Sequence, residues 1–528
     1  MAKTKLLCAS FIITSLILGI TSCSRGRKTS DSAVLVSDKR VHEQAYPAAE
    51  APRARESVNT EEYKRIDENE FLEAVNNPLS TFSIDVDTAS YSNIRRFLNQ
   101  GELPPQDAVR IEEMINYFDY KYPEPDGEDP FSISAELMRC PWESSHKIVQ
   151  IGLQAKRIPF NRAKANNLVF LIDTSGSMDS LNKLPLLKSA FRLLTEQLRE
   201  EDRVAIVTYA GSAGLLLPST PGIEKRMILS AIDQLQAAGS TAGGEGIKLA
   251  YTVARQQFIL SGNNRVILAT DGDFNVGVSS EGDLFRLIEK ERDSGVFLSV
   301  LGFGTDNLKD SKMELLADKG NGNYFYIDTI NEARKVLVNG LGGTLYTIAK
   351  DVKVQVEFNP ANVKAYRLIG YENRLMRAEE FNDDKKDAGE LGSGHSVTAL
   401  YEIIPEGVDT RQQHVDPLRY QSRDTTAAAA TDELMTVKLR YKSPDEAKSS
   451  MVAKSVVDED KDSVSDNTQF AAAVAEFGML LRNSKSKGHS SFDNCLKLAK
   501  ESIGEDREGY RAEFITLVEK TAELKRRS

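Results

Sequence analysis

The sequence has few of the residues that disulfide scaffolds, zinc sites and nucleic-acid-binding surfaces require. Its 528 residues include only four cysteines and five histidines, and these are too scattered to match the spacing of zinc ligands. The formal net charge is −11 at pH 7, and no stripe of basic residues is present, so nucleic-acid binding is not expected. The composition therefore indicates an acidic protein without a disulfide framework, long enough for several globular domains.

The first residues have the pattern of a bacterial export signal. Lys3 and Lys5 precede an apolar run over 6–20, which is too short for an ordinary membrane-spanning helix. The run leads into the letters ITSC, which end at Cys23 and resemble a lipobox, the motif whose cysteine is lipidated, for example with palmitate. We expect 1–22 to be a lipoprotein signal peptide and Cys23 to carry the membrane anchor. An ordinary cleaved signal is the alternative.

The residues after Cys23 describe the expected anchor further. Ser24 follows the cysteine, where an aspartate would be the inner-membrane retention signal of enterobacteria, so the outer membrane is favoured in a cell that has one. Residues 23–62 are polar and lack hydrophobic periodicity, which is typical of a flexible tether. With Cys23 lipidated, Cys140 and Cys495 could form at most one disulfide.

Residues 63–160 mix helical and strand patterns, as expected for an α+β region. A short strand is predicted over Phe82–Val86, followed by a helix that Asp87 or Thr88 can cap. Asp85 and Asp87 could also imitate a metal-binding cluster, but the helix cap is the favoured interpretation.

Alternating apolar and polar residues predict strands on both sides of the central part of the chain. The stretches 131–138 and 147–154 have this period of two, and it returns over 350–445, for example in DVKVQVEF. We therefore expect the strands before and after the central segment to form one β-sandwich into which that segment is inserted.

The central segment, 165–346, alternates short apolar strands with amphipathic helices. Such alternation is typical of a doubly wound, mostly parallel, Rossmann-like sheet covered by helices on both faces. The predicted strands are Leu168–Ile172, Arg203–Tyr209, a short edge strand Gly214–Leu217, Arg265–Thr270, Val296–Phe303 and Asn323–Ile327. The predicted helices are Lys183–Arg199, Glu245–Leu260, Asp283–Asp293, Ser311–Lys319 and Asn331–Thr344.

Two segments complete the chain. Residues 446–468 are polar and rich in acids, which predicts an acidic linker. Its end resembles a calcium loop, but Ser463 and Gln469 stand where such a loop has glycine and glutamate. Residues 469–528 have a helical pattern and are expected to pack as a small C-terminal helical unit.

Carboxylate and hydroxyl side chains gather where two predicted strands of the α/β segment end. Asp173 ends the first strand and Asp271 follows the fourth strand-like element. In the common strand order 3-2-1-4-5-6 these strands are neighbours at the switch point, where ligands bind. The sequence therefore predicts that the two carboxylates converge.

Three hydroxyl side chains complete a candidate site for a hard divalent ion. Ser175 and Ser177 follow Asp173, and Thr241 lies in a glycine-rich loop before a helix. Magnesium prefers six oxygen ligands in octahedral geometry. Neutral hydroxyls as direct ligands leave the ion electrophilic, so that a glutamate or aspartate of a partner protein could complete the octahedron.

These residues carry a resemblance to a known family. DTSGS, over 173–177, resembles the DxSxS motif of the metal-ion-dependent adhesion site in von Willebrand factor type A (VWA) domains, and Thr241 and Asp271 match its two other ligand positions. The flanking stretches, such as FSIDVDTASYSNIRRFLNQGELPPQDAVRIEEMINYF, look like those of YfbK-like bacterial VWA proteins. The resemblance covers roughly 65–525. It implies a cell-envelope protein with a VWA binding module that uses Mg²⁺ or Mn²⁺.

Two alternatives to metal-dependent adhesion are open for these residues. The ion could support metal-dependent hydrolysis, or the site could be vestigial in a structural envelope protein. An enzyme is not expected, because no histidine lies within the α/β segment and neither a G-x-S-x-G elbow nor a Walker loop is present. The partner's identity and the oligomeric state do not follow from the sequence.

Overall fold

The computed structural model describes residues 60–527 except 160–161, 241–242, 273, 275–279, 409–425, 445, 447 and 459–463. The predicted signal peptide, Cys23 and Thr241 therefore lie outside the described residues. Among the residues that are described, none of the helices combines the length and apolar character needed to cross a membrane.

The α/β segment folds around a six-stranded sheet with the order β10-β9-β8-β5-β6-β7. All neighbouring strands are parallel except β6 and β7, which are antiparallel. Counted along this segment, the order is 3-2-1-4-5-6, so this prediction is confirmed. The strands are β5 (Asn166–Asp173), β6 (Arg203–Tyr209), β7 (Ala213–Pro221), β8 (Asn263–Thr270), β9 (Val296–Phe303) and β10 (Tyr324–Ile327).

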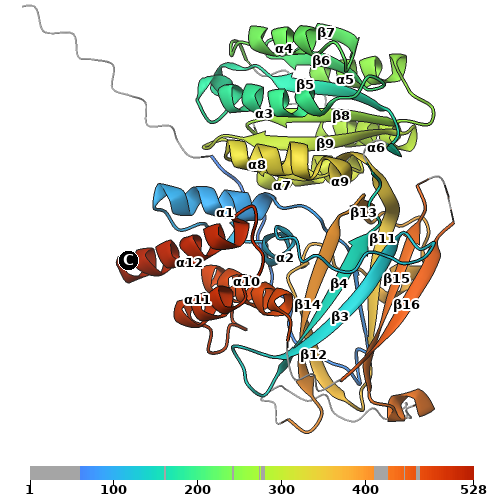
Figure 1. Cartoon of the computed structure of the whole chain (residues 1–528), viewed down its shortest axis with the longest axis vertical. Coiled ribbons are helices and arrows are strands. Elements are labelled where there is room, and N and C mark those ends of the chain that lie inside the picture. Colours follow the sequence, from blue (N-terminus) through green and yellow to red (C-terminus); the bar gives the residue numbers. More distant parts are fainter. Residues whose placement is uncertain are drawn as a thin grey trace, which may run out of the picture. The chain divides into compact units, whose positions relative to one another are not determined.

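Helices cover both faces of this sheet (Figure 1). One face packs against α3 (Leu184–Gln197), α4 (Lys225–Gln234), α8 (Ile330–Arg334) and α9 (Leu341–Leu345). The other face packs against α5 (Gly243–Gln256), α6 (Glu281–Asp293) and α7 (Asp310–Lys319). The predicted helix over 331–344 is interrupted, because Lys335–Asn339 forms a π-helix (η4). Helix α4 is not among the predicted helices, because it has few buried apolar residues.

The flanking strands form two five-stranded sheets that share one apolar core. One sheet has the order β1-β12-β14-β4-β3, and the other has β13-β11-β15-β16 with β2 paired to β11. Each sheet joins strands from both sides of the α/β segment, which confirms the predicted β-sandwich with an inserted domain. The strands are β1 (Leu72–Glu73), β2 (Leu79–Ser83), β3 (Phe131–Arg139), β4 (Lys147–Ala155), β11 (Thr347–Phe358), β12 (Val363–Ile369), β13 (Gly389–Gly392), β14 (Ser396–Pro405), β15 (Glu433–Lys442) and β16 (Ser450–Val457).

Part of the segment predicted as an acidic linker is instead a strand. Residues 450–457 form β16, which pairs antiparallel with β15 at the edge of its sheet. Of its side chains only Val456 is buried. An edge strand exposed on both faces lacks the period-two apolar signal, so composition alone misassigned it.

The C-terminal helices do not form a separate unit. The helices α10 (Asp466–Arg482), α11 (Phe492–Glu501) and α12 (Tyr510–Arg527) share one hydrophobic core with α1 (Ala89–Gln100) and α2 (Ile111–Asn116). The predicted helical content is correct, but the apolar faces are completed by residues from the start of the described chain. Cys140 and Cys495 are both buried in this core and are not joined by a disulfide. Short 3-10 turns lie at Gln106–Ala108, Gly176–Asp179, Ala378–Asn382 and Ala427–Ala430.

Candidate metal centre

Asp173 is held in a fixed position at the carboxyl edge of the α/β sheet. It is the last residue of β5, a strand whose eight residues are all buried. Its Oδ1 accepts a hydrogen bond from the backbone N–H of Ser175 at 2.9 Å. Its Oδ2 accepts from the hydroxyl groups of Tyr209, at 3.2 Å, and Thr270, at 3.3 Å. The strand thus delivers a carboxylate to the edge of the sheet, and its neighbours on β6 and β8 orient it.

The two predicted serine ligands lie together in the turn that follows β5. The Oγ atoms of Ser175 and Ser177 are 3.0 Å apart. The N–H of Gly176 donates to the carbonyl of Gly239 at 3.0 Å, so the turn is fixed against the loop that precedes α5. Gly239 has a φ of +88°, a conformation that favours glycine. This loop leads to Thr241, the predicted ligand outside the described residues.

Asp271 follows β8, the parallel neighbour of β5, and is fully buried. Lys183 Nζ donates to Asp271 Oδ2 at 2.8 Å, and Lys183 is itself only 5% exposed. This lysine is not among the predicted site residues. One signal was available, because Lys183 stands at the N-terminus of α3, where the helix dipole disfavours a cation.

The electrostatics of the site favour the addition of a cation. Burial, with a smaller contribution from the charge of Asp271, raises the pKa of Asp173 to about 6, although the hydrogen bonds from Ser175 and Tyr209 lower it. Carboxylate and hydroxyl oxygens are hard ligands of the kind that Mg²⁺ and Mn²⁺ prefer. The donor chemistry of the described residues therefore fits such an ion.

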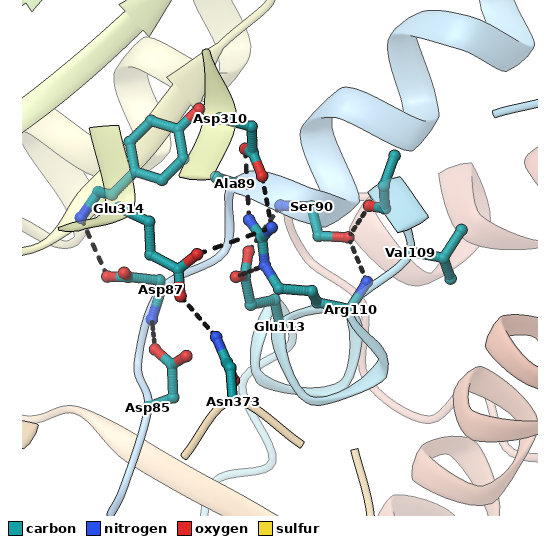
Figure 2. Close-up of polar contacts among 12 residues, drawn as sticks. Asp85, Asp87, Ala89, Ser90, Val109, Arg110, Glu113, Asp310, Glu314 and Asn373 are labelled. Atoms are coloured by element: carbon teal, nitrogen blue, oxygen red, sulfur yellow. Dashed lines mark hydrogen bonds and ion pairs between the residues drawn. The ribbon is translucent and has the colours of Figure 1, made fainter. Parts of the chain in front are cut away.

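A second cluster of buried carboxylates lies where α1, α2 and α7 meet. Carboxylate oxygens of Asp85, Glu113 and Glu314 lie within 4.8 Å of one another, and Figure 2 shows these side chains together. The prediction that Asp87 or Thr88 caps α1 is wrong, since no side-chain cap is formed. Instead Asp87 Oδ1 accepts from the backbone N–H of Tyr324. The local sequence pattern predicts that Asp87 caps α1, but in the folded protein this carboxylate binds the α/β domain instead.

Two guanidinium groups compensate this second cluster. Arg110 pairs with Glu113 and with Asp310, and Arg374 Nε donates to Asp85 Oδ2 at 3.0 Å. Arg374 Nη2 lies 3.2 Å from Glu314 Oε1.

The remaining oxygen atoms of the cluster are engaged as well. Glu113 Oε2 accepts from the backbone N–H of Ser90 at 2.7 Å, and Asp85 Oδ1 accepts from the N–H of Asp87 at 2.9 Å. Burial raises the pKa of Glu113 to about 8, although Arg110 lowers it. Because these acids are already bonded, the cluster is an ion-paired junction between domains rather than a metal centre.

Comparisons with known proteins agree with the class of protein that this fold and site define. Residues 167–338 match the family of the von Willebrand factor type A domain, and 57–150 match a family described as von Willebrand factor. Residues 343–524 match the C-terminal family of the uncharacterized protein YfbK. The chain is therefore a VWA protein with characteristic regions on both sides of its VWA domain.

The uncharacterized protein YfbK of Escherichia coli K12 is 45% identical over 468 residues, which cover 87% of this chain and 81% of the relative. The chain belongs to the YfbK family. Its VWA domain indicates a role in protein–protein interaction or adhesion, and the described relatives indicate no enzymatic activity.

More distant likenesses cover between 36% and 75% of this chain. The uncharacterized protein sll0103 of Synechocystis is 30% identical over 193 residues, 36% of this chain and 44% of that protein. Among solved structures, the von Willebrand factor type A protein from Catenulispora acidiphila is 17% identical, covers 73% of this chain and 89% of its own, and has a TM-score of 0.39. The ArnB paralog VWA2 from Sulfolobus acidocaldarius is 13% identical over 75% of this chain and 98% of its own, with a TM-score of 0.35.

Proposed function

We propose that this protein is a lipid-anchored protein of the bacterial cell envelope whose VWA domain binds an acidic side chain of a partner protein through Mg²⁺ or Mn²⁺. The ion would be held by Asp173, Ser175, Ser177, Thr241 and Asp271. One observation carries this proposal, namely the buried carboxylate of Asp173 beside the paired hydroxyl groups of Ser175 and Ser177 at the carboxyl edge of the sheet.

The hydroxyl and carboxylate side chains would have different roles in binding the ion. When bound, the ion would supply a positive centre for a carboxylate oxygen from outside. Ser175 and Ser177 would contribute neutral oxygens, so they would leave the charge of the ion largely uncancelled. Asp173 and Asp271, both fully buried, would hold the waters of the ion from behind. An aspartate or glutamate of the partner would then add the missing negative charge, which accounts for the expected chemistry of the partner.

The metal site is tested by calorimetric titration of the purified protein with MgCl₂ and MnCl₂. We expect one stoichiometric site in the wild type, lost in Asp173→Ala. Asp179→Ala is the matched control, because Asp179 is an exposed carboxylate in the same turn, and it should bind like the wild type. Equal binding by wild type and Asp173→Ala would contradict the assignment.

The interaction is tested by crosslinking in cells followed by mass spectrometry. A partner that depends on the site should be recovered with wild type and Asp179→Ala but not with Asp173→Ala or after chelation by EDTA. Recovery of the same partner from all four samples would rule out a metal-mediated contact. The hydrolase and the vestigial-site alternatives stay predictions without a specific observation in their favour.

The anchor is tested separately with Cys23→Ser. Labelled palmitate should enter the wild type and not this variant, and the variant should leave the membrane fraction. Fractionation of the two membranes of a cell that has both then tests the expected outer-membrane location.

A further inference from the structure

A buried lysine, Lys183, is held in a fixed position inside the candidate metal centre. Lys183 Nζ lies 2.8 Å from Asp271 Oδ2, and both side chains are buried. The stem of the lysine runs along the bare backbone of Gly304, where an added Cβ would come within 2.3 Å of its Cε and 2.4 Å of its Cγ. Gly304 is in turn fixed by Tyr326, whose hydroxyl group donates to the Gly304 carbonyl at 2.6 Å. The lysine is therefore held by the fold and is not a surface side chain that happens to fold inward.

The stem of the lysine packs against the segment that follows β9. Strand β8, which Asp271 follows, lies between β5 and β9 in the sheet. Gly304, against which the lysine packs, follows β9, whereas Asp173 ends β5. The stem of Lys183 thus packs beside the segment after β9, whereas Asp173 ends the strand on the other side of β8.

The placement of Lys183 opposes the local preference of the helix. Its carbonyl accepts from the N–H of Leu187 at the start of α3, where the helix dipole favours anions. A lysine that is buried here also loses its hydration, which is costly unless an anion compensates it. Asp271 supplies that anion. Each of the two buried charges compensates the other, and either charge alone would destabilise the fold.

The charges of the described side chains add up differently from those of an all-acidic metal site. Asp173 and Asp271 carry two negative charges and Lys183 carries one positive charge, so these three side chains have a net charge of −1. A divalent ion brings this to +1 and leaves a positive site for an external carboxylate. The same ammonium group must also repel the ion, because two cations near one buried carboxylate interact strongly where water is excluded.

We propose that Lys183 is the built-in counter-ion of the metal centre. It compensates the buried Asp271 while the site is metal-free and weakens metal binding, so that the protein is stable without an ion and binds one reversibly. This inference rests on the proposed function, since it assigns a regulator to the same site.

The test compares Lys183→Met, which keeps the apolar stem and removes the charge, with Lys183→Arg, which keeps the charge. Titration of the full chain with MgCl₂ should give an affinity at least tenfold higher for Lys183→Met than for the wild type. Lys183→Arg should stay within about threefold of the wild type. The metal-free Lys183→Met protein should unfold at a lower temperature than the wild type, and saturating Mg²⁺ should remove most of this difference.

An affinity of Lys183→Met that equals or falls below that of the wild type would overturn the inference, since the lysine would then orient Asp271 without opposing the ion. If Lys183→Met does not fold, Lys183→Gln replaces it, because its amide can still donate to Asp271. The same gain in affinity is expected, and its absence would be equally decisive. Loss of binding in Asp173→Ala separates the two proposals, because wild-type binding that survives that change contradicts the metal site itself.

Discussion

Two clusters of buried carboxylates can be compared in this protein, the candidate metal centre at the edge of the α/β sheet and the junction around Arg110. At the junction, two guanidinium groups bind several acids, and Asp85, Glu113 and Glu314 also accept hydrogen bonds from other N–H groups. At the candidate metal centre, one ammonium group faces one of two carboxylates, and the other carboxylate accepts hydrogen bonds from one backbone N–H group and two hydroxyl groups.

The difference lies in the geometry of the cation. A guanidinium group is planar and offers five donors, so it can bind several carboxylates at once. Few carboxylate oxygens then remain available to bind a metal ion. Lysine is a compact charge on a flexible stem and compensates one carboxylate at a time. The cluster with arginines is therefore complete in itself, whereas the cluster with lysine leaves Asp173 in a position to accept a further cation.

The largest expected effect comes from removing a cation at the junction. Arg110→Met leaves Asp310 and Glu113 buried without their partner, which should lower the free energy of unfolding by about 3–5 kcal/mol. The measurement is urea unfolding followed by the fluorescence of Trp142, the single tryptophan, which is buried in the helical core. Arg286→Met is the control, because its ion pair with Asp283 is exposed, and it should stay close to the wild type. Equal midpoints for the two variants would contradict the junction.

The next effect belongs to the metal centre alone. Mg²⁺ at a hundredfold excess over its dissociation constant should raise the free energy of unfolding by about 2.7 kcal/mol. Thermal unfolding with and without Mg²⁺ measures it. The increase should vanish in Asp173→Ala and persist in Arg110→Met, because the two clusters are independent. An increase that disappears in Arg110→Met would show instead that the junction controls the metal centre.

A smaller effect is the pH dependence of stability that Glu113 contributes at the junction. The pKa of Glu113 is raised from 4.5 to about 8 by burial, so the folded protein binds more protons than the unfolded chain between these values. The stabilisation is complete below pH 4.5 and is lost as the pH rises through 8.

Raising the pH from 5 to 8 should therefore destabilise the wild type by roughly 1 to 3 kcal/mol more than Glu113→Gln. Urea unfolding at both pH values measures this difference. Glu505→Gln serves as an exposed control, and a pH dependence that Glu113→Gln leaves unchanged would exclude Glu113 as its source.

The smallest effect is an expected lack of change. Glu314→Gln removes one of the three junction carboxylates that lie close enough to hold an ion, yet the stoichiometry and affinity for Mg²⁺ should equal those of the wild type. Calorimetric titration measures both. A second metal site in the wild type that this variant loses would show that the arginines do not exclude an ion.

Local sequence patterns predicted the helices and strands in which apolar residues recur at regular spacing or form a continuous run. The buried strands β5 and β8 were found within two residues of their ends, since every residue in them is buried. The edge strand β16 was missed because nearly all of its side chains are exposed. At the site, the motif placed Asp173, Ser175 and Ser177 in one turn, but no local pattern joins Lys183 to Asp271, which lies 88 positions away in the chain.

The sequence by itself determined the alternation of strands and helices, the strand ends that carry Asp173 and Asp271, and the resemblance to the YfbK-like VWA proteins. Only the tertiary structure decided which charges meet. Arg110 and Asp310 are 200 positions apart in the chain, and Lys183 and Asp271 are 88 positions apart. Hydrophobic periodicity is a local property of the chain. The compensation of a buried charge depends on distance through space, which is set only when the layers pack.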